Sequence, residues 1–84
     1  MSDDVFELEI IYQDRNEKYE INWVEIESPT GNFTVGPDHI PLVSLIQERG
    51  KVTYKEYGKE ITSIDAYSGM FIVSNNKARI IFDM

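Results

Sequence analysis

Residues 69–82 read Gly-Met-Phe-Ile-Val-Ser-Asn-Asn-Lys-Ala-Arg-Ile-Ile-Phe, and this stretch decides the fold class. Residues 69–74 and 78–82 are short and rich in β-branched and aromatic side chains, which is typical of strands. Asn75 and Asn76 stand between them, and Asn tolerates the positive φ that a tight hairpin turn needs. The stretch therefore predicts two antiparallel strands joined by a short turn.

Segments of the same kind cover the rest of the chain. Apolar residues alternate with polar ones over residues 6–12, and residues 51–57 and 60–67 predict a second hairpin. Near Trp23 the apolar alternation shifts by one residue, which predicts a β-bulge. Shorter strands are expected over residues 33–35 and 42–46, and no segment has a helical period. We therefore expect one domain over residues 1–84, an antiparallel β-sandwich or barrel of about eight or nine short strands.

The charge of the chain narrows the classes of partner. Fifteen acidic residues against eight basic ones give a formal charge of −7, and the basic residues are scattered. Nucleic acid and an anionic membrane surface are not expected as partners, because both require a basic face. No apolar run approaches the ~20 residues of a membrane-spanning helix, so no direct membrane insertion is expected. The acidic first residues also differ from the basic start of a secretory signal.

The side chains that usually carry chemistry are sparse. The chain has no cysteine and a single histidine, His39, which cannot form a zinc site alone; its ring is expected to bond the loop backbone. Glu7 with Glu9, and Glu25 with Glu27, could pair for acid–base work on a sugar, but their alternation with apolar residues favours a solvent-facing role. We predict no catalytic residue, no metal ligand and no cofactor.

One loop carries a family resemblance. Residues 31–42 read Gly-Asn-Phe-Thr-Val-Gly-Pro-Asp-His-Ile-Pro-Leu. They resemble the signature loop of the F-type ATP synthase epsilon subunit, usually Gly-Glu-Leu-Gly-Ile-Leu-Pro-Gly-His-Ala-Pro-Leu. Residues 68–83 resemble that family's Gly-Gly-Phe-Leu-Glu-Val and Asn-x-Val-Thr-Val-Leu-Ala-Asp segments, and the two motifs stand in the right order. The identical positions are Gly31, Pro37, His39, Pro41, Leu42, Gly69, Val73, Asn76 and Asp83.

The chain also departs from the family pattern. Asn32 stands where a Glu is usual, so a charged contact by that turn is not expected, and Asp38 stands where the loop usually has Gly. The family's C-terminal helical hairpin would begin just after Asp83, and the chain ends at Met84. We therefore assign this chain neither the inhibition nor the ATP binding that the resemblance associates with that hairpin.

The resemblance implies a ten-stranded β-sandwich that acts as a non-catalytic rotor subunit of an ATP synthase. It implies two partners, the gamma subunit and the polar loops of the membrane c-ring, at the cytoplasmic side of a bacterial plasma membrane. Asn32 and Phe33 would face the ring, and the loop would meet gamma. The expected partner-binding residues are Gly31, Asn32, Phe33, Val35, Pro37, Asp38, His39, Ile40, Pro41 and Leu42.

Two other classes of function stay open at this point. An adaptor or regulatory protein could keep the same sandwich without assembling with ATP synthase. A small ligand-binding or carbohydrate-active β domain could instead use the aromatic residues Tyr12, Trp23 and Tyr67.

Overall fold

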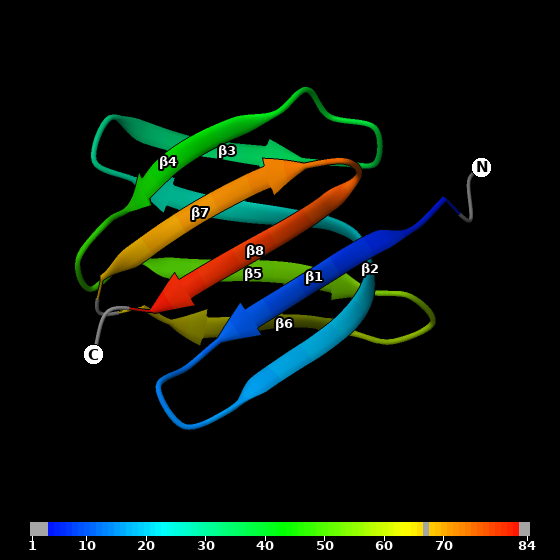
Figure 1. Ribbon diagram of the computed structural model, residues 1–84, viewed down its shortest axis with the longest axis horizontal. Coiled ribbons are helices and arrows are strands. Elements are labelled where there is room, and N and C mark those ends of the chain that lie inside the picture. The colour runs from blue at the N-terminus through cyan, green and yellow to red at the C-terminus, as the bar shows by residue number, and fades with distance from the viewer. Residues whose placement is uncertain (1–3, 67, 83–84) are drawn as a thin grey trace.

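The computed structural model describes residues 4–66 and 68–82 of the chain, and every regular element in these residues is a β-strand. This confirms the all-β prediction, with eight strands where about ten were expected from the resemblance. Tyr67 and Asp83 lie outside the described residues. The strands are β1 (Phe6–Ile11), β2 (Asn16–Ser28), β3 (Gly31–Val35), β4 (Leu42–Ile46), β5 (Lys51–Glu56), β6 (Ile61–Asp65), β7 (Gly69–Ser74) and β8 (Lys77–Phe82) (Figure 1).

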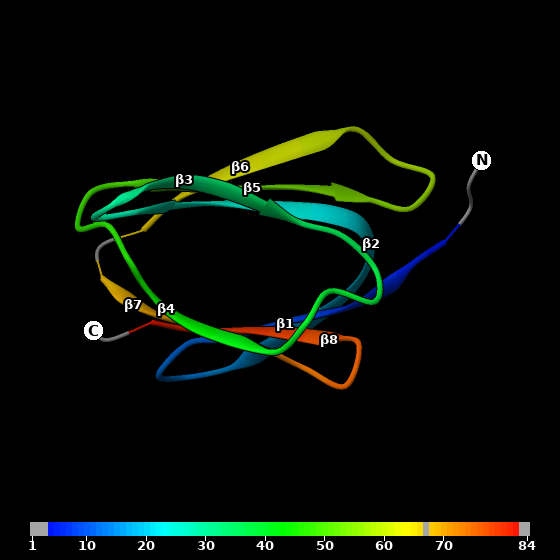
Figure 2. The same ribbon diagram turned by 90° about the horizontal axis from the view of Figure 1, so that it is seen from above.

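The strands belong to one sheet that folds over itself into two layers (Figure 2). The order along the sheet is β4-β7-β8-β1-β2-β5-β6, and β3 pairs with the second half of β2, on the edge opposite to β5. We call the layer formed by β4, β7, β8, β1 and the first half of β2 the β7–β8 layer. The β5–β6 layer contains β3, the second half of β2, β5 and β6. Each layer therefore covers the apolar face of the other, as in a sandwich.

Strand β2 joins the two layers. Its residues 16–21 pair with β1, and its residues 21–26 pair with β5, with a shift of register between Ile21 and Trp23. The predicted bulge near Trp23 is thereby confirmed. A bulge bends a strand and increases its twist, which lets one long strand pass from one layer into the other.

One pair of neighbours departs from the antiparallel expectation. Strands β1 and β8 lie side by side and parallel, with Leu8 opposite Ala78 and Ile10 opposite Ile80 (Figure 1). A parallel pair requires a long connection, and the whole of the intervening chain provides it. The periodicity of either strand is the same in both arrangements, so the sequence pattern alone does not distinguish them.

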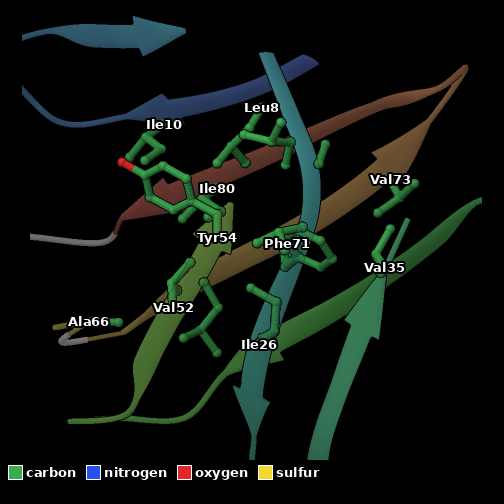
Figure 3. Packing of buried hydrophobic residues seen from close by; sticks show 14 of the residues in the cluster. Leu8, Ile10, Ile26, Val35, Val52, Tyr54, Ala66, Phe71, Val73 and Ile80 are labelled. Carbon is green, nitrogen blue, oxygen red and sulfur yellow. The ribbon is translucent and has the colours of Figure 1, made fainter. Parts of the chain in front are cut away.

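The core lies between the layers. In Figure 3, Tyr54 and Val52 of one layer face Ile10, Ile80 and Phe71 of the other. Burial of these apolar side chains is the main favourable contribution to folding. The buried apolar residues are Phe6, Leu8, Ile10, Ile21, Val24, Ile26, Val35, Ile46, Val52, Tyr54, Ala66, Phe71, Val73, Ala78, Ile80 and Phe82.

Two tight turns join neighbouring strands, one between β7 and β8 and one between β2 and β3. Asn75 and Asn76 have φ of 53° and 59° and separate the paired residues Ser74 and Lys77, so they form the two-residue hairpin turn that the sequence predicts. Between β2 and β3, Ser28 pairs with Gly31, and the Ser28 hydroxyl donates a hydrogen bond of 2.5 Å to the Gly31 carbonyl.

None of the described residues forms a helix long and apolar enough to cross a membrane.

Candidate functional site

The connection between β3 and β4, residues 36–41, is the proline-flanked loop of the family motif. It descends from the β5–β6 layer to the β7–β8 layer at the end of the sandwich where the β7–β8 turn also lies (Figures 1 and 2). Asp38 has a positive φ of 62°, a conformation that favours Gly, which is the family's usual residue at this position. The backbone N–H of Asp38 donates a hydrogen bond of 2.7 Å to the side-chain oxygen of Asn76.

The ring of His39 has a local structural role. Its Nδ1 lies 2.7 Å from the carbonyl oxygen of Ile40, so the ring donates a hydrogen bond to the loop backbone. This is the arrangement expected from the sequence. The same loop leaves the side chain of Ile40 74% exposed, which makes Ile40 the most prominent apolar group at this end of the molecule.

The residues expected to bind partners fall into two groups. Gly31 and Asn32 are exposed at the start of β3, whereas Asp38, Ile40 and Pro41 are exposed in the loop that follows its end. The two groups therefore lie at opposite ends of β3, and of the sandwich (Figure 1). Pro37, His39 and Leu42 are half-buried beside the exposed loop residues.

Two of the expected contact residues point inward. Val35 is fully buried, and Phe33 packs against the core with its ring centroid 6.0 Å from that of Phe71 in the other layer. The side chain of Val35 is therefore not available to a partner, and most of Phe33 serves packing between the layers. The alternation of Asn32, Phe33, Thr34 and Val35 already assigns the two apolar residues to one face.

An exposed apolar surface lies on the outside of the β7–β8 layer. Leu45 of β4 is opposite Met70 of β7, and Met70 is opposite Ile81 of β8, so the three side chains stand in one row across three strands. Val43 and Ile72 form a second, parallel row. We call these five residues, Val43, Leu45, Met70, Ile72 and Ile81, the outer apolar face.

The outer apolar face extends along the sandwich from the proline-flanked loop toward the β2–β3 turn. At that far end it continues into a groove of about 490 Å³. The groove is lined by Pro29, Leu45, Ile46, Ser68, Gly69, Met70, Ile81 and Phe82. An apolar strip with polar surroundings is the usual composition of the centre of a protein–protein interface.

Sequence reasoning missed the outer apolar face, although a signal was present. Residues 42–46, Leu-Val-Ser-Leu-Ile, are apolar on both sides of the strand, and so are Phe71 with Ile72 and Ile80 with Ile81. A strand that is apolar on both sides is typical of a sheet with both faces covered. Here one side meets the core, and the other is the outer apolar face, where Leu45 is 60% exposed.

Two ion pairs lie on the outer surface of β1 and β8, next to the outer apolar face. Glu7 lies opposite Lys77 and Glu9 opposite Arg79 on the parallel strands, with N–O distances of 3.7 and 3.3 Å. Glu9 is only 8% exposed and also accepts a hydrogen bond of 3.0 Å from the side-chain amide of Asn16. A basic side chain beside each carboxylate favours a structural role over sugar chemistry.

The second acidic pair also divides into structural roles. Glu27 accepts a hydrogen bond of 2.9 Å from the backbone N–H of Lys51, and its own carbonyl accepts one of 2.7 Å from Gln47 N–H. Glu27 thus holds both ends of the turn between β4 and β5. Glu25 lies two residues earlier on the same strand face, opposite Thr34 and Thr53.

Tyr12 and Trp23, the two described residues of the three considered for ligand binding, are not brought together. Tyr12 follows the end of β1, whereas Trp23 lies just beyond Ile21, the partner of Phe6 at the other end of β1. The Tyr12 ring is also covered by the Arg15 guanidinium, 4.0 Å from its centroid, and lies 5.5 Å from the Phe82 ring. Over residues 4–66 and 68–82, no three acidic or histidine side chains gather in a way that could hold a metal ion.

The chain forms a small β-sandwich domain with an apolar outer face and a proline-flanked loop. The chain is similar to ATP synthase epsilon chains, which confirms the resemblance seen in the sequence. Two curated relatives with that name, from two strains of Clostridium kluyveri, are each 29% identical to it over 82 residues. The alignment covers 96% of this chain and 61% of each relative, so the chain spans about three-fifths of their length.

A solved structure shares the fold. A chain from the central stalk and c-ring of the mitochondrial ATP synthase of Tetrahymena thermophila superposes with a TM-score of 0.79, over 92% of this chain and 63% of that chain. Its sequence is 9% identical, so this likeness concerns the fold alone. No family model matches the chain.

Proposed function

We propose that this chain is a non-catalytic rotor subunit of an F-type ATP synthase and joins the gamma subunit to the polar loops of the c-ring. The similarity to epsilon chains over 96% of the sequence supports this role. Such a subunit transmits torque between its partners, needs no cofactor, and belongs to a complex at the cytoplasmic side of a bacterial membrane. Its physical requirement is rigidity between two separate contact surfaces.

The observation that carries the proposal is the continuity between the loop and the outer apolar face. Ile40 in the loop is 74% exposed, and β4 begins two residues later and presents Val43 and Leu45, which are 68% and 60% exposed. We assign this combined surface to the gamma subunit, because burying such apolar groups provides the main driving force for association. The amide of Asn32, at the far end of β3, is assigned to a polar contact with the c-ring.

The arrangement of strands supports the transmission of force between the two ends. Strand β3 is paired along its length with β2, which also pairs with β1 in the other layer and with β5 in its own. Phe33 and Val35 hold β3 to the core. A displacement at the loop therefore acts on packed strands rather than on a free segment, and packed interiors have low compressibility.

The test is a binding measurement between this chain and the gamma subunit of the same organism. Replacing Leu45 by Asp places a charge in the proposed interface, and we expect the affinity to fall at least about tenfold, as for loss of a buried apolar anchor. Ile61→Asp is the matched control, because Ile61 is 59% exposed and lies on β6 in the other layer. Equal affinity of both variants, each folded, would show that the outer apolar face does not bind gamma.

A further inference from the structure

We propose that Asn76, in the turn between β7 and β8, is a positioning residue that holds the proline-flanked loop in its docking conformation. The loop and the turn are 38 residues apart in sequence and are joined by the hydrogen bond from Asp38 N–H to the Asn76 side-chain oxygen, at 2.7 Å. The proposal depends on the proposed function for its partner, the gamma subunit. It adds a residue outside the loop to the determinants of that contact.

The residue type at position 76 indicates a role outside the turn itself. A two-residue turn with positive φ at both positions favours Gly at the second, because Gly adopts that conformation without steric cost. Asn76 occupies the second position with φ 59°. The turn itself therefore gains nothing from an Asn there over a Gly, whereas the loop gains an acceptor for the Asp38 N–H.

The conformation of Asp38 explains why the loop benefits from an anchor at this residue. Its φ of 62° costs more for Asp than for Gly, although Asp tolerates this conformation better than most residues, and a hydrogen bond to the backbone here offsets part of that cost. The loop has few donors with which to anchor itself, because Pro37 and Pro41 have no N–H. The bond to Asn76 acts on the one residue of the loop that needs support most.

The hydrogen bond affects docking through the fraction of time that the loop spends in its bound conformation. The apparent dissociation constant equals that of the competent loop divided by this fraction, so a loop that opens part of the time binds more weakly. Ile40 lies two residues after Asp38 and is the most exposed apolar group of the loop. Holding Asp38 therefore limits the movement of Ile40 relative to the start of β4, so that the proposed docking surface needs less ordering when gamma binds.

The test uses the 84-residue chain with Asn76→Gly, and with Asn75→Gly as the matched control. Both variants place Gly at a turn residue of positive φ, and only the first removes the acceptor. Two quantities are measured for each: exchange of the Asp38 amide hydrogen with water by NMR, and the dissociation constant with the gamma subunit. A third variant, Asn76→Asp, keeps an acceptor oxygen at position 76.

We expect Asn76→Gly to raise the ratio of open to closed loop, and with it the rate of Asp38 exchange, by about fivefold, as for loss of one hydrogen bond. Binding to gamma should weaken by the factor by which the competent fraction of the loop falls, which is at most about fivefold. Asn75→Gly should change neither quantity by more than about twofold, and Asn76→Asp should restore slow exchange. Unchanged exchange in Asn76→Gly would overturn the positioning role, whatever happens to binding. A dissociation constant that does not rise by the factor that the measured fall in the competent fraction requires would overturn the docking role of the loop conformation. Failure of the unaltered chain to bind gamma would instead overturn the proposed function, while the exchange result still decides whether Asn76 positions the loop.

Discussion

Replacing Gly69 by Ala tests how closely the strands of the β7–β8 layer approach one another. Gly69 begins β7 and lies opposite Phe82 of β8 and Ile46 of β4. A Cβ atom at this position would lie well inside van der Waals contact with the carbonyl oxygen of Ile81, and 3.3 Å from the Cα of Phe82. Both obstacles are backbone atoms, so no side-chain rotation can relieve the clash.

The magnitude follows from the nature of that clash. Forcing one methyl group into a packed region typically costs about 1–3 kcal/mol, and a backbone obstacle favours the upper part of that range. For a domain of this size, each 1 kcal/mol lowers the melting midpoint by about 4–8 °C. We therefore expect Gly69→Ala to lower the midpoint by roughly 10–20 °C.

The assay is thermal unfolding followed by circular dichroism, with Gly36→Ala as the control. A Cβ at Gly36 meets nothing within 4 Å, so this change should leave the midpoint unaltered or raise it slightly. If Gly69→Ala unfolds at the same temperature as Gly36→Ala, the close approach of β7 and β8 is not what selects Gly at position 69.

Three further changes test separate parts of the structure. Glu27→Ala should lower the free energy of unfolding by about 1 kcal/mol, because Lys51 N–H loses its acceptor, and Glu25→Ala should cost less; equal losses in urea unfolding would contradict the role of Glu27 in the turn. Phe33→Ala should cost about 2 kcal/mol through lost packing on Phe71, whereas Ile40→Ala should cost under about 0.5 kcal/mol, and a reversed order would contradict the inward position of Phe33. The pKa of the Glu17 carboxyl is lowered by the hydrogen bond from Tyr19, 2.7 Å long, and then by the one from Arg15. Its stabilising effect is therefore present above its ordinary pKa and is lost as the pH falls through the lowered value. Tyr19→Phe should raise the pKa of Glu17, and an unchanged NMR titration of that carboxyl would refute this explanation.

Local sequence patterns predicted the strands and the two hairpin pairings, β5 with β6 and β7 with β8, but not the pairing of strands that are distant in sequence. The alternation in residues 6–12, the phase shift at Trp23 and the Asn75-Asn76 turn all correspond to features of the structure, because each depends on residues close in sequence. The parallel pairing of β1 with β8 depends on contacts across the whole chain, such as Ile10 with Ile80. Periodicity assigns the faces of a strand and carries no information about its neighbour.

The candidate site was predictable in part for the same reason. The motif located the loop at residues 36–41, and its usual Gly corresponds to the positive φ that Asp38 adopts. Strand alternation would also have turned Phe33 and Val35 inward, had it been applied within the motif. The outer apolar face could be suspected from residues 42–46 but not located, because only the pairing of β4, β7 and β8 brings Leu45, Met70 and Ile81 into one row.

The hydrogen bond between Asp38 and Asn76 could not be predicted from local sequence patterns, because the two residues are 38 positions apart. Both residues belong to turns and both adopt positive φ, which the sequence explains one turn at a time. Their contact arises because the β3–β4 loop and the β7–β8 turn lie at the same end of the sandwich (Figure 1). Such a contact depends on how the sheet brings distant turns together, and local sequence patterns do not specify this.

The most direct test of the proposed rotor role is affinity capture of the tagged chain from its own cells, with mass spectrometry of the proteins that accompany it. The Leu45→Asp variant serves as the control, captured from the same cells at the same level. If the chain is a rotor subunit, the unaltered chain should recover the gamma subunit together with catalytic subunits or the c-ring, and the variant should recover much less. Recovery of none of these from a lysate in which the ATP synthase is intact would contradict it, and would favour an adaptor that keeps the sandwich without joining the synthase.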